Sequence, residues 1–235
     1  MKGKLYLFPA TLGESPIDES LPSHHLHYLK NTKHFIVEDL RSARRFLKKA
    51  CPEIVIDDLS FSMLNEHTSS TDIIQLLEPL KQGHDVILLS EAGLPCVADP
   101  GASLVALAHE AAITVVPLVG PSSIYLALMA SGMNGQHFVF HGYLPIDKRE
   151  RNARLKQLEA DAWIKDQTQI FIETPYRNLQ MLEALLQACK PDTRICIAMN
   201  LTLEDEWIRS QTVEKWKKGS VPEINKKPAV FLLYR

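Results

Sequence analysis

The 235-residue chain lacks any long hydrophobic run. Its longest apolar stretches, such as Ala229 to Tyr234, fall far short of the roughly 20 residues that a membrane-spanning helix needs. The first residues, Met1 to Lys4, lead directly into a strand-like segment and not into the apolar core of a signal peptide. From these absences we expect a cytoplasmic protein with no membrane role.

Cysteine is scarce and scattered, at positions 51, 96, 189 and 196. No two of these cysteines form a Cys-x-x-Cys pair, and no histidine stands beside them at metal-ligand spacing, so the sequence predicts neither a zinc site nor a disulfide scaffold. Excess charge is also missing: the net charge is -2. A surface built entirely to hold nucleic acid is therefore not expected, and any such contact must be local.

The common nucleotide-binding motifs are absent as well. The chain contains no Gly-x-Gly-x-x-Gly and no Gly-x-x-x-x-Gly-Lys-Ser/Thr. These absences argue against a Rossmann dehydrogenase, a Rossmann-type methyltransferase and a P-loop NTPase.

What is present is a regular alternation of short apolar runs with longer segments of helical period. The run from Asp85 to Ser90 is apolar on consecutive positions, as in a parallel strand covered on both faces. This alternation predicts an α/β fold with parallel or mixed sheets. The punctuated stretch from Pro117 to Pro121 predicts a hinge between two α/β domains, residues 1–118 and 119–235.

Local signals place several elements within this alternation. Ser69 is a cap for a helix that Pro79 should kink or end, and residues 54–63 are weakly strand-like. The segment from Ile124 to Ala130 is apolar nearly all round, so we expect it to be trapped between two layers. Thr174 and Pro175 predict a helix start, with Thr174 as its N-cap.

Three loops rich in glycine, proline and small residues follow strands of the first half. They are Pro9 to Gly13 (loop 1), Ser90 to Pro95 (loop 2) and Val119 to Ser123 (loop 3). Ligands of open α/β sheets bind beyond the carboxyl ends of the strands, so three such loops predict one binding mouth. Taken singly, each loop could equally be a simple turn.

An ordered set of motifs extends this interpretation over nearly the whole chain. The motifs are Leu5-Tyr-Leu-Phe-Pro9 with Gly13, Glu38-Asp-Leu-Arg41, Ser90-Glu-Ala-Gly-Leu-Pro95 with Asp99-Pro-Gly101, Val116-Pro-Leu-Val-Gly-Pro-Ser122 and Gly142-Tyr-Leu-Pro145. The set resembles the tetrapyrrole methylase superfamily. Within that superfamily it is most similar to the ribosomal RNA small subunit methyltransferase I family, which methylates a cytidine ribose 2′-hydroxyl.

The resemblance implies a homodimer of two-domain chains that holds S-adenosylmethionine, the methyl donor, in a cleft between the domains without a metal. It also implies which residues contact the donor: Leu12, Gly93, Leu94, Val97, Ser122, Ser123, Ile172, Met199, Leu201, Pro228 and Ala229. Several of these are small or apolar, so much of the binding should come from backbone groups and shape.

A ribose hydroxyl must lose its proton when it is methylated, and the sequence does not identify the base. Glu38 and His67 lie in motif-like segments and are the candidates. In the alternative interpretation, Glu38 pairs with Arg41 at a strand end and His67 lies in a solvated turn.

Two basic clusters are candidates for contacts with RNA phosphates. One comprises Arg41, Arg44, Arg45, Lys48 and Lys49 on one helix face, and the other comprises Lys148, Arg149, Arg151, Arg154 and Lys156. Within them we predict that Arg41, Arg44, Arg45, Lys148 and Arg149 bind substrate. Ordinary solvated helix faces would give the same pattern.

The chain departs from the ribosomal family where Ala198-Met-Asn-Leu-Thr-Leu203 replaces the usual Ala-Arg-Glu-Leu-Thr-Lys. Loop 2 also carries Glu91 for the usual Asp and Leu94 for the usual Thr. Three functions therefore stay open: an RNA ribose methyltransferase acting on ribosomal RNA or the small subunit, a methylase of a tetrapyrrole precursor or another small molecule, and a non-catalytic module that binds the donor or RNA.

Overall fold

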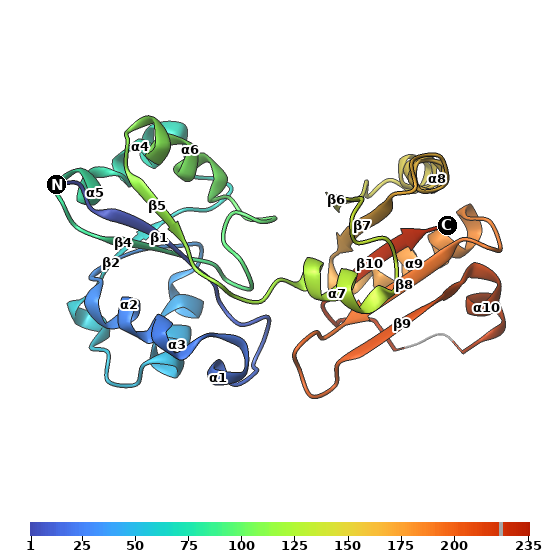
Figure 1. Cartoon of the computed structure of the whole chain (residues 1–235), viewed down its shortest axis with the longest axis horizontal. Coiled ribbons are helices and arrows are strands. Elements are labelled where there is room, and N and C mark those ends of the chain that lie inside the picture. Colours follow the sequence, from blue (N-terminus) through green and yellow to red (C-terminus); the bar gives the residue numbers. More distant parts are fainter. Residues whose placement is uncertain (221–222) are drawn as a thin grey trace. The chain divides into compact units, whose positions relative to one another are not determined.

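The computed structural model describes residues 1–220 and 223–235. Its contacts divide the chain into two compact units, Met1–Ser122 and Ser123–Arg235. Each unit contains one five-stranded sheet with helices on both faces (Figure 1). No helix in the described part of the chain is long and apolar enough to span a bilayer.

The first unit is built on a fully parallel sheet in the order β3-β2-β4-β1-β5. Its strands are β1 (Lys4–Phe8), β2 (His34–Val37), β3 (Ser60–Met63), β4 (Val86–Leu89) and β5 (Thr114–Pro117). Its helices are α1 (Ile17–Ser20), η1 (Ser23–His25), α2 (Leu26–Asn31), α3 (Leu40–Ala50), η2 (Ile56–Asp58), α4 (Ser70–Gln75), α5 (Glu78–Lys81) and α6 (Ala102–Glu110).

Both faces of this sheet are buried, as the continuous apolar runs predict. All four residues of β4 are buried. On one face, Phe35 and Ile87 belong to a core shared with α2 and α3. On the other face, Ile36 and Leu88 belong to a second core shared with α4, α5 and α6. The sheet is thus a rigid central layer whose strand ends position the loops that follow them.

The second unit has a mixed sheet in the order β6-β7-β10-β8-β9, in which only β6 and β7 are parallel. Its strands are β6 (Phe138–Tyr143), β7 (Thr168–Glu173), β8 (Arg194–Met199), β9 (Trp207–Thr212) and β10 (Ala229–Tyr234). Its helices are α7 (Ser123–Ser131), α8 (Lys148–Lys165), η3 (Pro175–Arg177), α9 (Asn178–Ala188) and α10 (Val213–Lys218). Phe171 and Phe231 stack at the centre of the core beneath α8 and α9.

Several local expectations need correction. Residues 54–63 form a short 3-10 helix before β3, so only their last four residues are strand. The helix capped by Ser69 stops at Gln75, and Pro79 lies in the first turn of a separate helix, α5, because its missing N–H is tolerated there. Thr174 is the N-cap of η3 and Pro175 opens that helix, as predicted, but the Thr174 hydroxyl makes no capping bond and accepts from Arg177 Nε.

Within the second unit, helix α7 is covered on one face, and its enclosure between two layers stays a prediction. It packs against β8, β9 and β10 through one face, where Ala127 and Leu128 are buried. Tyr125 and Met129, on the remaining surface of the helix, are exposed. Within the second unit, this helix is therefore covered on only one face, although its residues are apolar nearly all round.

Candidate functional site

The three predicted loops of the first unit meet beyond the carboxyl ends of β1, β4 and β5. Ala10 of loop 1 and Gly93 of loop 2 form a bridge of two main-chain hydrogen bonds, with N···O distances of 2.9 and 3.2 Å. Loop 3 joins them at Gly120, where an added Cβ would lie 2.3 Å from Pro9 of loop 1. The parallel sheet brings these strand ends to one edge, as the sequence indicated.

Gly93 is the residue at which loop 2 meets both of the other loops. Its φ of +73° is one that residues with a side chain rarely adopt. A Cβ at this position would lie 3.1 Å from the Leu12 side chain and 3.3 Å from the Pro121 carbonyl oxygen. All three loops thus come together at one glycine, and we call this meeting point the cradle.

The continuation of loop 2 has an unusual backbone. Cys96 and Ala98 adopt φ values of 66° and 59°, in the left-handed region that non-glycine residues seldom occupy. Asp99 then accepts a hydrogen bond from the Gly101 amide at 2.8 Å, just before α6 begins. Strain of this kind persists only where surrounding contacts impose it, and it gathers at binding sites.

A pocket of about 150 Å³ opens between loops 1 and 2 and the exposed side of α3. Leu12, a predicted donor contact, and Arg45, a predicted substrate contact, both line it. Ser42 and Glu91 line this pocket and also the adjoining smaller one that contains Glu38. The Ser42 hydroxyl donates to Glu91 Oε1 at 2.8 Å. The fold therefore gathers residues from separate predicted groups into one site.

Glu38 follows β2 directly and lies beside two other carboxylates. Burial raises the pKa of Glu38 to about 8, helped by a hydrogen bond with Asp99 and by the negative charges of Asp99 and Glu91. Among the ion pairs of the described residues, none joins Glu38 to Arg41, and the neighbours that act on the pKa of Glu38 are the carboxylates Asp99 and Glu91. With a pKa of about 8, the deprotonated fraction of Glu38 grows as pH rises toward 8, and only this fraction can accept a proton as a general base.

His67 lies in a different environment. It is in the turn between β3 and α4, its side chain is 85% exposed, and its one ion-pair partner among the described residues is Glu66 at 3.5 Å. It lines neither pocket around Glu38. The structure therefore makes Glu38 the stronger of the two candidate bases.

The remaining predicted donor contacts of loops 2 and 3 differ in exposure. Leu94 and Val97 lie along loop 2 and its continuation, with Val97 exposed and Leu94 half-buried. Ser122 is buried at the end of loop 3, and Ser123 begins α7 at the boundary between the two units.

In the second unit, the predicted donor contacts lie together at one edge of the mixed sheet. Met199, the last residue of β8, pairs with Ala229, the first residue of β10. Ile172 near the end of β7 pairs with Val230. The Asn200 amide donates to the Pro228 carbonyl oxygen at 3.0 Å, which brings Leu201 to the same edge. Residues far apart in sequence are thereby gathered into a second group.

The basic residues of α3 are all exposed on the side opposite its buried stripe, as predicted. Lys48 donates to the Ile54 carbonyl at 2.6 Å, and Arg44 lies over the Phe61 ring at 5.6 Å from its centroid. Within residues 1–220 and 223–235, no side-chain hydrogen bond holds Arg41 or Arg45. These two guanidinium groups are available for an anionic ligand.

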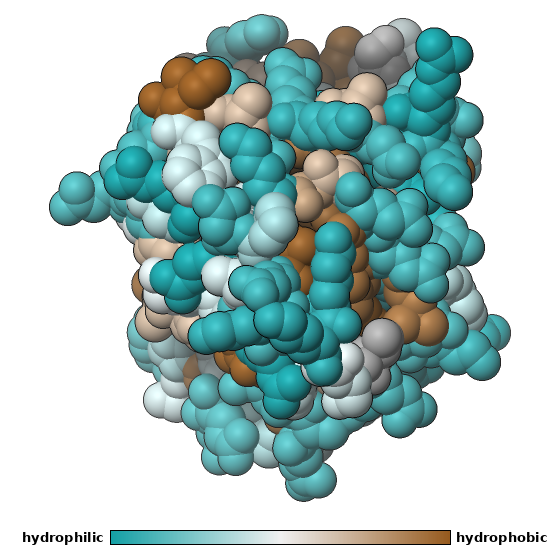
Figure 2. Space-filling view, turned by 90° about the vertical axis from the view of Figure 1, so that its right-hand side faces the viewer, coloured by the Kyte–Doolittle hydropathy of each residue, from teal (hydrophilic) through white to brown (hydrophobic). Residues whose placement is uncertain are grey.

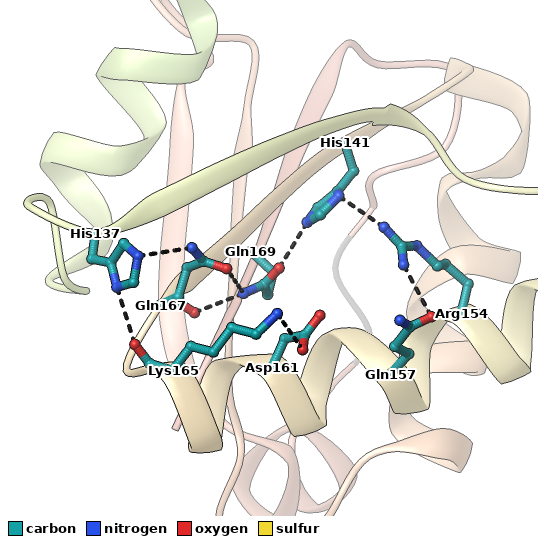
Figure 3. A network of polar contacts seen from close by, with 8 residues as sticks. All are labelled: His137, His141, Arg154, Gln157, Asp161, Lys165, Gln167 and Gln169. Atoms are coloured by element: carbon teal, nitrogen blue, oxygen red, sulfur yellow. Dashed lines mark hydrogen bonds and ion pairs between the residues drawn. The ribbon is translucent and has the colours of Figure 1, made fainter.

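The basic cluster of α8 needs correction because two of its members point inward. Arg151 is buried and donates to the Ile146 carbonyl at 3.2 Å. Arg154 donates to His141 Nδ1 at 3.1 Å, and His141 Nε2 donates to Gln169 at 2.7 Å (Figure 3). This polar network between α8 and strands β6 and β7 continues through Gln167 to His137. Burial and the Arg154 charge lower the pKa of His141.

Lys148, Arg149 and Lys156 remain on the surface, where they line an open pocket at the start of α8. The face of the second unit seen in Figure 2 is mainly hydrophilic, with apolar side chains visible in a hollow near its middle. Lys148, Arg149 and Lys156 thus form a smaller cationic cluster on the surface, which suits a phosphate contact.

Sequence reasoning missed Ser42, Phe46 and Asp99 as parts of the site. Ser42 was within reach, because Asp39-x-x-Ser42 is the capping pattern that places it in the first turn of α3, beside Glu38. Phe46 follows one turn later and lines both pockets. Asp99 belongs to one of the ordered motifs, but the motif did not indicate its contact with Glu38, which exists only because β2 and β4 are neighbours in the sheet.

Comparison with known proteins gives a consistent set of relatives. Residues 19–216 match the family described as Tetrapyrrole (Corrin/Porphyrin) Methylases. Proteins named Ribosomal RNA small subunit methyltransferase I are similar in sequence. The one from Streptococcus pyogenes serotype M3 is 32% identical over 94% of this chain and 70% of its own length. The one from Haemophilus influenzae is 32% identical over 74% of this chain, which spans 60% of that relative.

Solved structures agree on the fold. The methyltransferase CobJ matches with a TM-score of 0.65 and 17% identity, covering 99% of this chain and 94% of its own. Cobalt precorrin-4 methyltransferase CbiF matches with a TM-score of 0.63 and 16% identity, covering 98% and 94%. At such low identity these two likenesses establish the two-sheet α/β architecture alone.

Proposed function

The chain belongs to the tetrapyrrole methylase family, and from this premise we propose that it transfers a methyl group from S-adenosylmethionine to a cytidine ribose 2′-hydroxyl of small-subunit ribosomal RNA. The observation that carries the proposal is the meeting of loops 1, 2 and 3 at Gly93, together with the raised pKa of Glu38, which shares a pocket with Ser90 and Glu91 of loop 2. The RNA acceptor is proposed from the names of the relatives, of which this chain spans 60 to 70% in length.

The donor is proposed to contact both groups of residues described above, one in each unit. The cradle around Gly93 suits a ligand recognised by backbone groups, because loops 1 and 2 meet there through main-chain hydrogen bonds and Gly93 has no side chain that would cover them. Asn200 and Pro228 order the main chain of the second group. Alignment of donor and acceptor in this way can supply on the order of 7–11 kcal/mol of the barrier lowering.

In the methyl transfer, the ribose oxygen forms a bond to the methyl carbon while the carbon–sulfur bond breaks and its electron pair returns to sulfur. The hydroxyl proton must leave the ribose, and we assign it to the Glu38 carboxylate. Asp99 and Glu91 keep the proton affinity of Glu38 high enough for this role. Ser42 fixes Glu91 through its hydroxyl.

The proposed RNA contact involves Arg41, Arg44 and Arg45 of α3, with Lys148 and Arg149 of α8. Arg45 lines the same pocket as Leu12, so a phosphate bound there would lie next to the donor loops. We further propose that the active form is a homodimer in the cytoplasm, with the domain division near residues 118–122. Sedimentation of the purified chain tests the dimer.

The decisive experiment has two arms. Calorimetry with S-adenosylhomocysteine tests the donor site, and absence of binding would refute the methyltransferase. Transfer of tritiated methyl groups to small-subunit RNA from a strain deleted for the gene should exceed transfer to RNA from the parent strain. Equal incorporation would refute the RNA acceptor while leaving the donor site intact.

A small-molecule acceptor is the second candidate, favoured by the replacement of the ribosomal family's Arg, Glu and Lys by Met199, Asn200 and Leu203. Met199 is buried against Ala229 and offers no charge to a nucleic acid. Acceptor binding through several phosphates weakens steeply with salt, whereas binding of a small acceptor does not. The salt dependence of the acceptor KM therefore separates the two candidates.

A further inference from the structure

Asn178 is a fully buried polar residue whose side chain forms hydrogen bonds with the backbone of a segment distant in sequence, residues 224–227. It is the first residue of α9, and its exposed fraction is 0%. Its Nδ2 donates to the carbonyl oxygens of Ile224 and Lys227 at 2.9 and 2.7 Å. A buried amide group that satisfies two main-chain carbonyls fixes the backbone of the segment that carries them, since either carbonyl would otherwise lack a partner.

The segment held in this way leads directly into the Pro228–Ala229 step, where donor contacts are proposed. Within the segment, Lys226 adopts a left-handed φ of 62°, which a non-glycine residue keeps only with outside support. The Lys226 amide donates to the Pro175 carbonyl oxygen at 2.8 Å, in the turn that precedes Asn178. Asn178 thus bonds to the two ends of the segment, at Ile224 and Lys227, and Pro175 bonds to its middle, at Lys226.

A second set of bonds holds the far side of the same step. The Asn200 amide donates to the Pro228 carbonyl, and the Asn200 side chain donates to Asp205 Oδ2 at 2.8 Å. Lys227 Nζ lies 3.1 Å from the same carboxylate oxygen. Pro228–Ala229 is therefore braced from β8 as well as from α9, and Asn178 is the only fully buried side chain in these braces within the part of the chain that the structure describes.

We infer that Asn178 is a positioning residue for donor binding: by holding Ile224 to Lys227 it keeps the backbone at Pro228–Ala229 in the shape that receives the adenosyl group. This role rests on the proposed methyltransferase function. A ligand recognised through main-chain groups binds tightly only where those groups are ordered in advance, because ordering them on binding costs affinity. Asn178 itself does not contact the donor.

The test replaces Asn178 with Asp. The side chain keeps its shape, but both N–H donors are replaced by an oxygen that faces two carbonyl oxygens. Calorimetry should show S-adenosylhomocysteine bound about tenfold more weakly than by the wild type, with the donor KM raised by about the same factor. The kcat at saturating donor should stay within about twofold, because the reacting groups are untouched.

Asn134→Asp provides a matched control in the same unit. Asn134 Nδ2 donates to the Asp166 carbonyl at 2.9 Å, at the opposite end of β7 from Asn178. This variant loses a comparable bond and some thermal stability, but it should bind S-adenosylhomocysteine as the wild type does. Equal weakening by both substitutions would overturn the positioning role and indicate a general loss of order.

Two further measurements keep the inference testable if Asn178→Asp folds poorly. Asn178→Ser removes the amide without adding charge and should weaken donor binding by a smaller factor. Hydrogen exchange at the Lys226 and Asn200 amides should be faster in either variant than in the wild type. Wild-type donor affinity in a folded Asn178 variant refutes the inference, whereas a wild-type chain that binds no S-adenosylhomocysteine refutes the methyltransferase itself.

Discussion

Glu38 offers the sharpest test of the proposed chemistry because its pKa is raised to about 8. If the carboxylate accepts the ribose proton, kcat/KM follows its deprotonated fraction and rises tenfold per pH unit below the midpoint. With a midpoint near 8, the value at pH 6 should be about a hundredfold below the plateau. Methyl transfer measured from pH 5.5 to 9.5 checks this, and a profile flat above pH 6 would contradict the assignment.

Two substitutions separate the role of Glu38 from that of its neighbours. Glu38→Gln should remove both the pH dependence and most of the activity. Asp99→Asn removes a negative charge next to Glu38 while retaining an oxygen for the Gly101 amide, so the midpoint should move to lower pH. An unchanged midpoint in Asp99→Asn would show that the carboxylate pair does not set the proton affinity.

The same carboxyl group makes a prediction about stability. Its folded-state pKa of about 8 lies above the ordinary value of 4.5, so between these pH values the folded chain binds more protons than the unfolded chain. Stability from this group is therefore present below about pH 4.5 and is lost as pH rises toward 8. The Tm of Glu38→Gln relative to wild type should rise through this window and level off above it, as thermal melts can show.

Three further changes probe other parts of the molecule. Gly93→Ala should cost about 1–2 kcal/mol of stability because Gly93 has a left-handed φ. Calorimetry should also show weaker S-adenosylhomocysteine binding, because the added methyl group crowds Leu12. Undiminished donor binding would refute the role of the cradle in binding the donor. Arg45→Ala should lower the slope of log binding constant against log salt for single-stranded RNA by about 0.7 if Arg45 binds one phosphate, whereas Lys81→Ala, on α5 before β4, should leave that slope unchanged. Phe171→Ala removes a ring stacked on Phe231 at 5.8 Å and should cost ~3–5 kcal/mol in urea unfolding, and a loss below 1 kcal/mol would mean that the second core is loosely packed.

Sequence analysis recognised buried strands by their runs of consecutive apolar residues. The runs at Val86–Leu89 and Ala229–Tyr234 are apolar throughout because helices cover both faces of each sheet. Strand β9, from Trp207 to Thr212, was missed because it lies at a sheet edge and its polar residues carry no such run. Edge strands take their conformation from the neighbour with which they pair, which a local pattern does not reveal.

The candidate site was predictable where it depends on turns and unpredictable where it depends on neighbouring strands. The loops around Gly93 were predicted because they are rich in glycine, proline and small residues. The contact between Glu38 and Asp99, in contrast, requires β2 to lie beside β4. Arg151 shows a different limit: it stands on the stripe of α8 that continues through Leu155 and Leu158, so its spacing indicated the core although its charge indicated the surface. Spacing was the better guide.

The Ala10–Gly93 bridge has a consequence for how this protein can change. The two loops are joined through peptide groups, which every amino acid except proline supplies alike, so their connection survives exchange of most side chains around them. Positions 91, 94 and 97 of loop 2 and its continuation carry Glu91, Leu94 and Val97, whose side chains are not part of this bridge. Randomising positions 91, 94 and 97 while Gly93 is retained would therefore produce a library with an intact frame and new ligand preferences.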